Sequence, residues 1–238
     1  MVRTTQNKIY RQGINEAKEL EQGFPGTAEE LFAYQGLIIG DVEAAYFTPA
    51  QQELIRLFAD RRGGGILFLG GRETLSDGGY VNSPLAELLP VSLLVRKDTF
   101  HREDAKFELT AAGRDSLICR LLEQPDKNAE RWEKMPAIAD YQEVGEKKPG
   151  AVVLAESVVP GKGKYPLLVT ENYGSGRTAL FATGGSWRWQ MLQEHTDMTH
   201  ETFWRQLARW LVADSPNPVS VTTPRQVLSD EGRLKLRA

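Results

Sequence analysis

The chain has 238 residues, of which 41% are hydrophobic and 26% charged, so it is long enough for one α/β domain with a full core and has the composition of a soluble globular protein. Its net charge of -3 and isoelectric point near 5.8 argue against a dedicated nucleic-acid-binding protein, whose surface is usually basic. No apolar run approaches the ~20 residues needed to span a bilayer, so we expect no direct insertion of this chain into a membrane.

The single cysteine, Cys119, excludes an intrachain disulfide bond and a cysteine-based metal cluster. It lies in a helical pattern of apolar residues, where a free cysteine behaves as a small hydrophobic side chain. We therefore expect Cys119 to be a buried packing residue. We expect no metal site and no cofactor.

The sequence divides into three parts. Residues 1–26 are polar, with a short helix over residues 15–22, and contribute little to a core. Residues 27–214 carry the helical and strand patterns of one domain. Residues 215–238 open with a proline-rich linker and continue with strand-like stretches that have no obvious partner, so we expect them to be loosely attached or paired with a neighbouring chain.

A strand–helix–strand unit organises the first half of the domain. After a short helix that begins with the capping box Thr27–Glu30, residues 37–41 form a strand that ends on Asp41. The next helix begins at Thr48, with proline at its first position and Gln51 placed to complete a second capping box. A glycine triplet ends it, and the apolar residues 66–69 follow as a buried strand. Such a unit is parallel and right-handed in nearly all cases.

The remaining elements follow from apolar periodicity and turn residues. Residues 92–95 and 106–110 are predicted to be extended, 113–122 helical, and 128–134 a turn that carries Trp132. Strands are expected at 151–155 and 165–170, the second forming a hairpin with 177–182 across the turn 172–176. A last long helix is expected over residues 199–213.

The carboxyl ends of the first two strands are the predicted site. In an open parallel sheet, ligands gather beyond these ends, where Asp41 and the stretch Gly70-Gly71-Arg72-Glu73 stand. The glycines could present backbone N–H groups to an anion, with Arg72 as a bidentate partner. They could equally form a tight turn in which glycine permits positive φ or close packing. Asp41 could be a site residue or an acceptor for a following loop.

Aromatic and histidine residues offer further candidates. Alternation along an extended segment would place Trp187 and Trp189 on one side, either as an aromatic wall of the cleft or as packing anchors. His195 and His200 lie near acidic residues, which invites a metal site. However, His200 and Glu201 are adjacent on a helix and would point in different directions, so capping or surface roles are the alternative.

Three stretches, 63–79, 173–189 and 201–211, together resemble the class I glutamine amidotransferase-like superfamily. The most similar branch is found inside large bacterial proteins that also carry membrane helices and a von Willebrand A-type domain. Residues 173–177 and 181–185 are also similar to the trehalose-utilisation branch. The resemblance covers residues 24–214 and implies a flavodoxin-like three-layer sandwich with a mostly parallel central sheet. It also implies a β-rich segment after the domain, and a first strand before residue 36 that residues 1–26 do not supply.

The same resemblance implies a nucleophilic cysteine in a turn that here reads Phe68-Leu69-Gly70-Gly71-Arg72. Because glycine has no side chain, we expect no catalytic residue and a non-catalytic binding or assembly module. The expected partners are other domains of a larger, membrane-anchored parent protein, or a second copy bound through the C-terminal tail, with the domain itself soluble and cytoplasmic. The alternative is a hydrolase acting on a sugar-like or amide ligand, with Asp41, Glu73 and His200 as acid–base residues.

Overall fold

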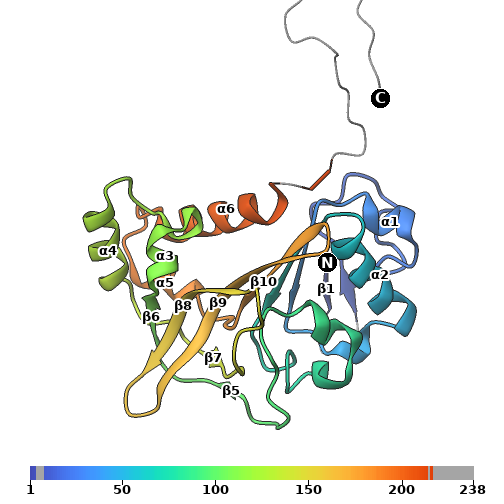
Figure 1. The fold of residues 1–238 in the computed structure, drawn as a ribbon. Coiled ribbons are helices and arrows are strands. Elements are labelled where there is room, and N and C mark those ends of the chain that lie inside the picture. The colour runs from blue at the N-terminus through green and yellow to red at the C-terminus, as the bar shows by residue number, and fades with distance from the viewer. Residues whose placement is uncertain (4–7, 214, 217–238) are drawn as a thin grey trace, which may run out of the picture.

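In the computed structural model, which describes residues 1–3, 8–213 and 215–216, the chain forms an α/β fold around a six-stranded sheet (Figure 1). Its strands lie in the spatial order β3-β4-β10-β9-β8-β6. Their bounds in that order are Gly36–Gly40, Gly65–Leu69, Gly176–Phe181, Gly163–Tyr173, Val152–Val159 and Lys106–Leu109. Two short sheets pair β1 (Val2–Arg3) with β2 (Ile9–Tyr10) and β5 (Phe100–His101) with β7 (Tyr141–Gln142).

The central sheet has a parallel and an antiparallel half. The strands β3, β4 and β10 are parallel, as the strand–helix–strand pattern predicts and as in a flavodoxin-like fold. The strands β10, β9, β8 and β6 are antiparallel to their neighbours, so the expected parallel pairing holds only at the start of the sheet. For β9 and β10 the reason is the short turn that joins them, since a connection of this length can join only antiparallel strands.

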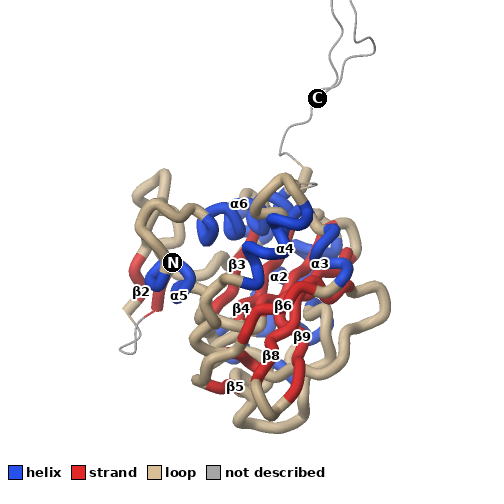
Figure 2. The backbone as a smooth tube through the Cα atoms, turned by 90° about the vertical axis from the view of Figure 1, so that its left-hand side faces the viewer, coloured by secondary structure: helices blue, strands red, loops and turns tan. Residues whose placement is uncertain are grey.

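Helices cover both faces of the sheet. Their bounds, for α1 to α6, are Ala28–Phe32, Pro49–Asp60, Ala111–Asp115, Pro125–Glu133, Trp187–Leu192 and Thr199–Val212. A Cβ atom on Gly64 would meet Phe58 of α2, and one on the next residue, Gly65, would meet Leu211 of α6. Successive strand residues point to opposite faces, so α2 and α6 lie on opposite faces of the sheet. Figure 2 shows α6 above the strands in the perpendicular view.

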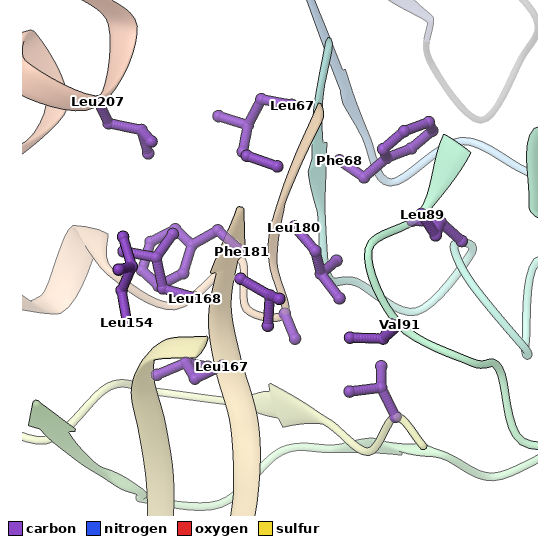
Figure 3. Close-up of a cluster of buried hydrophobic side chains, with 14 of the residues drawn as sticks. Leu67, Phe68, Leu89, Val91, Leu154, Leu167, Leu168, Leu180, Phe181 and Leu207 are labelled. Carbon is purple, nitrogen blue, oxygen red and sulfur yellow. The ribbon is translucent and has the colours of Figure 1, made fainter. Parts of the chain in front are cut away.

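The core follows the same alternation. Phe181 and Leu168 point toward Leu207 of α6, whereas Phe68 and Leu180 point toward the loop that carries Leu89 and Val91 (Figure 3). On the α6 face, an aromatic cluster joins β6, α4, α5, α6 and β10; its members are Phe107, Trp132, Phe181, Trp189 and Phe203. These contacts position α5 and α6 beside the carboxyl end of β10.

Local signals in the sequence are confirmed where they involve capping or tight turns. The side chain of Thr48 accepts from the Gln51 N–H, and the Gln51 side chain accepts from the Thr48 N–H, so the capping box is complete. The side chain of Thr27 accepts from the Glu30 N–H. Cys119 is buried, as expected. The hairpin over residues 163–181 and the last helix also form.

Three expectations are wrong in detail. Residues 15–22 form turns rather than a helix, and residues 92–95 form no strand. The helical stretch 113–122 is broken, because Ser116 adopts an extended conformation and its side chain accepts from the Ile118 N–H to start a separate 3₁₀ turn, Leu117–Cys119. The expected strand-like tail lies outside the described residues from residue 217 onward.

Candidate functional site

The turn after β4 is closed by contact with the end of β10. The Gly70 N–H donates to the carbonyl of Phe181 over 2.8 Å. A Cβ atom on Gly70 would lie 2.4 Å from the Ala182 carbonyl carbon and 2.5 Å from the Thr183 nitrogen. Neither Gly70 nor Gly71 has a positive φ. Glycine is therefore needed here for close packing of two backbones, not for a left-handed conformation.

Asp41 joins the carboxyl ends of β3 and β4. Its Oδ1 accepts from the Glu73 N–H over 3.0 Å, and a Cβ atom on Gly71 would lie 2.6 Å from the same oxygen. Asp41 has a φ of +48°, an uncommon conformation for a residue other than glycine. The structure thus brings together Asp41, Gly71 and Glu73, as the strand ends predict. The side chains of Arg72 and Glu73 are exposed at this edge.

A buried glutamine accepts a hydrogen bond from the turn after β4. Gln142, only 1% exposed, accepts from the Gly71 N–H through its Oε1 atom over 3.2 Å. Its Nε2 donates to the carbonyl of Thr74 over 3.0 Å and to Asp77 and Thr99 over 3.2 Å each. The amides of Gly70, Gly71 and Glu73 therefore all donate within the chain. Such a set of used donors does not form an anion cradle of the kind that open amides provide.

Asp77 completes this buried network. Its Oδ2 accepts from the Thr99 N–H, the Thr99 hydroxyl and the Phe100 N–H, at 3.0, 2.6 and 2.9 Å. Burial alone would raise the pKa of Asp77, but the hydrogen bonds from Thr99 and Phe100 outweigh it and lower the pKa. Sequence analysis missed Gln142, because a lone glutamine in a two-residue strand gives no signal. Nor does any local sequence pattern indicate that Asp77 accepts hydrogen bonds from Thr99 and Phe100.

The segment that follows β10 is also held by hydrogen bonds. The Thr183 hydroxyl lies 2.9 Å from Asp140 Oδ1, and the same oxygen accepts from the Gly184 N–H over 2.9 Å. The Gly185 N–H donates to the Thr183 hydroxyl over 2.8 Å. The glycine pair Gly184-Gly185 is therefore also held by hydrogen bonds to Asp140 and Thr183, and no local sequence pattern indicates this role of Asp140.

The two tryptophans of the predicted wall point in different directions. They lie on the helix α5, not on an extended segment, and residues two apart on a helix differ by about 200°. Trp189 is fully buried and its indole N–H donates to the Pro136 carbonyl over 2.9 Å, whereas Trp187 is 53% exposed. The expectation that both tryptophans share one side is therefore wrong. Trp189 is a packing anchor, and Trp187 remains on the surface.

His200 lies in the first turn of α6, against Trp204, with ring centroids 6.4 Å apart. Partial burial lowers the pKa of the His200 imidazole. Within the described part of the chain, no hydrogen bond or ion pair joins His200 to Asp41 or Glu73. Nor do the described residues contain a group of three or more His, Cys, Asp or Glu side chains that could hold a metal ion.

Comparison with known proteins decides the family. Residues 2–213 match the family model GATase1-like, described as "Putative glutamine amidotransferase". The chain belongs to this family. No curated protein matches it.

Two solved structures from Salmonella typhimurium share the fold of this GATase1-like domain. Cytoplasmic Protein STM1381 is 26% identical, with a TM-score of 0.63; the alignment covers 80% of this chain and 77% of that one. Cytoplasmic Protein STM3548 is 21% identical, with a TM-score of 0.64, and the alignment covers 81% and 77% of the two chains. In the described residues, none of the helices is long and apolar enough to cross a membrane.

For a GATase1-like domain, the position of the single thiol matters. Cys119 lies in the 3₁₀ turn that packs against α6, and burial raises the pKa of its thiol to about 12. A thiol with such a pKa is a very poor nucleophile at neutral pH, because the thiolate is the reactive form. His195 is exposed, and the nearby Asp197 pairs with Arg131 and accepts from the Thr199 N–H.

Proposed function

We propose that this GATase1-like domain is a non-catalytic module that binds or assembles with other domains of a larger bacterial protein. The observation that carries the proposal is the closed turn at Gly70. The resemblance to glutamine amidotransferases implies a catalytic cysteine at this position. A side chain there would run into the backbone of Ala182 and Thr183, so the turn lacks both the nucleophile and the space for one.

The backbone around Gly70 supports the same reading. A nucleophile elbow holds its residue in a strained turn so that the side chain projects into a cleft. Near the site, the non-glycine residues with positive φ are Asp41 and Leu75, whereas φ of Gly70 is not positive. The strained positions thus hold a hydrogen-bond acceptor and a buried core residue. Neither position holds an attacking group.

Exposed apolar side chains on α5 support an assembly role. Trp187 and Met191, four residues apart on one helix face, are 53% and 70% exposed, and Leu192 and Met198 nearby in sequence are 65% and 54% exposed. Large exposed tryptophan and methionine side chains are typical of protein-binding surfaces. The two similar Salmonella proteins are named as cytoplasmic proteins, and we place this module in the cytoplasm as well, with membrane anchoring left to other parts of the parent.

A glutaminase assay tests the catalytic part of the proposal. The purified chain, its Gly70→Cys variant and its Cys119→Ser variant are incubated with glutamine, and released ammonia is measured. We expect background rates in all three, because adding a thiol at Gly70 cannot open the turn or supply a general base. Turnover by the wild-type chain that persists after Cys119→Ser would overturn the proposal.

The hydrolase alternative has one favourable observation, the proximity of the Asp41 carboxylate to the backbone of Glu73 at an exposed edge. Among the residues that the structure describes, no hydrogen bond or ion pair joins His200 to either residue, so these three groups form no proton relay there. If a sugar-like or amide ligand were turned over, Asp41→Asn and Glu73→Gln should each abolish the activity. Unchanged rates in both variants would remove this alternative.

A further inference from the structure

The strand β3 is an edge of the central sheet, and among the described residues its outer side takes part in no strand pairing. It pairs with β4 on its inner side. Its sequence, Gly-Leu-Ile-Ile-Gly, contains none of the charged or proline residues that usually protect an edge. Ile38 is 51% exposed, although it lies at the centre of the strand.

An apolar groove follows this edge. It has a volume of about 210 Å³. Leu31, Leu37 and Phe47 line it from the domain, and Met1 and Phe24 line it from the N-terminal segment. A groove beside an open strand edge is the geometry used for strand addition, in which main-chain hydrogen bonds give affinity and side-chain pockets give specificity.

The helix α6 delivers the chain to the beginning of this edge. A Cβ atom on Gly36, the first residue of β3, would lie 2.8 Å from Val212 at the end of α6. Beyond α6, the Ser215 hydroxyl lies 3.2 Å from the Arg62 guanidinium, which also donates to the carbonyl of Tyr34 just before β3. The described chain therefore ends at the amino end of β3, where a further parallel strand would have to begin.

The sequence that follows suits a strand of this length. Residues 219–223 read Val-Ser-Val-Thr-Thr, five residues rich in β-branched side chains, opposite the five residues of β3. Prolines stand on both sides, at positions 218 and 224. Pro216 lies against Gly63, just before β4. The outer side of β3 is two strand spacings away from β4, about 10 Å at ~4.8 Å per spacing. Three extended residues span about 10 Å, enough to cover this distance.

A connection from β10 through α6 to the outer side of β3 would also have the preferred right-handed sense. The unit β3–α2–β4 crosses the sheet in one direction with its helix on one face. A connection from β10 back to the outer side of β3 crosses in the opposite direction, so it keeps the preferred right hand only if its helix lies on the other face. The helix α6 lies on that other face. The charges also suit this arrangement. Arg225 would follow the added strand at the end of β3 where the carboxylate of Asp41 is exposed.

We propose that residues 219–223 of the same chain add to β3 as a seventh, parallel strand, with Val219 and Val221 facing the groove. Amide hydrogen exchange on the full chain tests this. We expect residues 219–223 to exchange at least about 10-fold more slowly than an unstructured peptide. Val221→Pro should abolish that protection and speed exchange of the outward amides of β3, whereas Leu234→Pro, farther along the tail, should change neither. Unprotected residues 219–223 in the wild-type chain, or β3 exchange that ignores Val221→Pro, would overturn the proposal.

A cross-link provides a second measurement that does not depend on the proline variant. In a Cys119→Ser background, Ile38→Cys with Ser220→Cys should form an intrachain disulfide on oxidation. Ile38→Cys with Ser229→Cys is the matched control and should not. Disulfide-linked dimers, or protection that disappears on dilution, would show that the groove takes a strand from a second copy and would refute addition within one chain.

Discussion

The close approach of β4 and β10 at Gly70 predicts that this position does not tolerate even a methyl group. In Gly70→Ala, the new Cβ atom would lie 2.4–2.5 Å from the main chain of Ala182 and Thr183, closer than real Cβ contacts come. Backbone atoms cannot rotate away as a flexible side chain can. The strand end of β10 must therefore move away from β4, and the 2.8 Å hydrogen bond from Gly70 to Phe181 lengthens or breaks.

The magnitude follows from these two effects. Overpacking in a dense core costs about 1–3 kcal/mol, and loss of a buried hydrogen bond about 1 kcal/mol. Replacing glycine restricts the unfolded chain and offsets roughly 0.4–1 kcal/mol of this loss. We expect the free energy of unfolding of Gly70→Ala to fall by about 2–3 kcal/mol, a large share of the 5–15 kcal/mol typical of a native domain.

Urea unfolding followed by tryptophan fluorescence measures this change. With a slope of about 2–3 kcal/mol per M, the midpoint should drop by roughly 1 M. Gly184→Ala is the matched control from the same junction, because its Cβ atom would lie 3.4 Å from the Gly70 carbonyl oxygen and its φ is not positive. It should change stability by less than about 0.5 kcal/mol. Equal midpoints for Gly70→Ala and the wild-type chain would refute the claim that the turn is closed.

Three further outcomes are expected. Trp189→Ala should lower the unfolding free energy by about 3–5 kcal/mol in the same urea assay, and Trp187→Ala by less than about 0.5 kcal/mol, because only the first is buried; equal effects would contradict the opposed orientations on α5. The lowered pKa of Asp77 means that its contribution to stability is present above the unfolded pKa of about 3.9 and is lost as the pH falls through the lower folded pKa. The stability difference between the wild-type chain and Asp77→Asn should therefore shrink below about pH 4, and a difference that grows toward acid would refute the assignment. Cys119, buried with a raised pKa, should react with a thiol reagent only as fast as the chain unfolds, so rapid labelling under native conditions would contradict its placement.

Sequence reasoning located the floor of the candidate site because its signals are local. The capping box at Thr48, the glycine triplet and the apolar run before Gly70 define a parallel pair of strands, and the ends of such strands lie together. That argument alone brought Asp41 next to Glu73. The helix that carries Trp187 could not be predicted in this way, because two tryptophans flanking an arginine are compatible with a strand as well as with one helical turn.

Long-range polar contacts could not be predicted in the same way. Gln142 and Asp140 come from segments far along the chain, and their roles depend on which backbone groups arrive beside them after folding. Pairing partners in the sheet are similarly undetermined by periodicity, which identifies a strand but not its neighbour. The antiparallel half could be anticipated only at the hairpin, where a short turn fixes the partner.

The strand β10 is shared by the two halves of the sheet, and this has a consequence for synthesis of the chain. The strands β8, β9 and β10 are consecutive and can pair as soon as they are made, whereas β4 waits for β10 from a distant part of the sequence. Until residues 176–181 leave the ribosome, the strand β4, of which the first four residues are buried, has one unpaired edge. Chains stopped before that point should therefore aggregate, and a complete β10 should be the step that makes the nascent protein soluble.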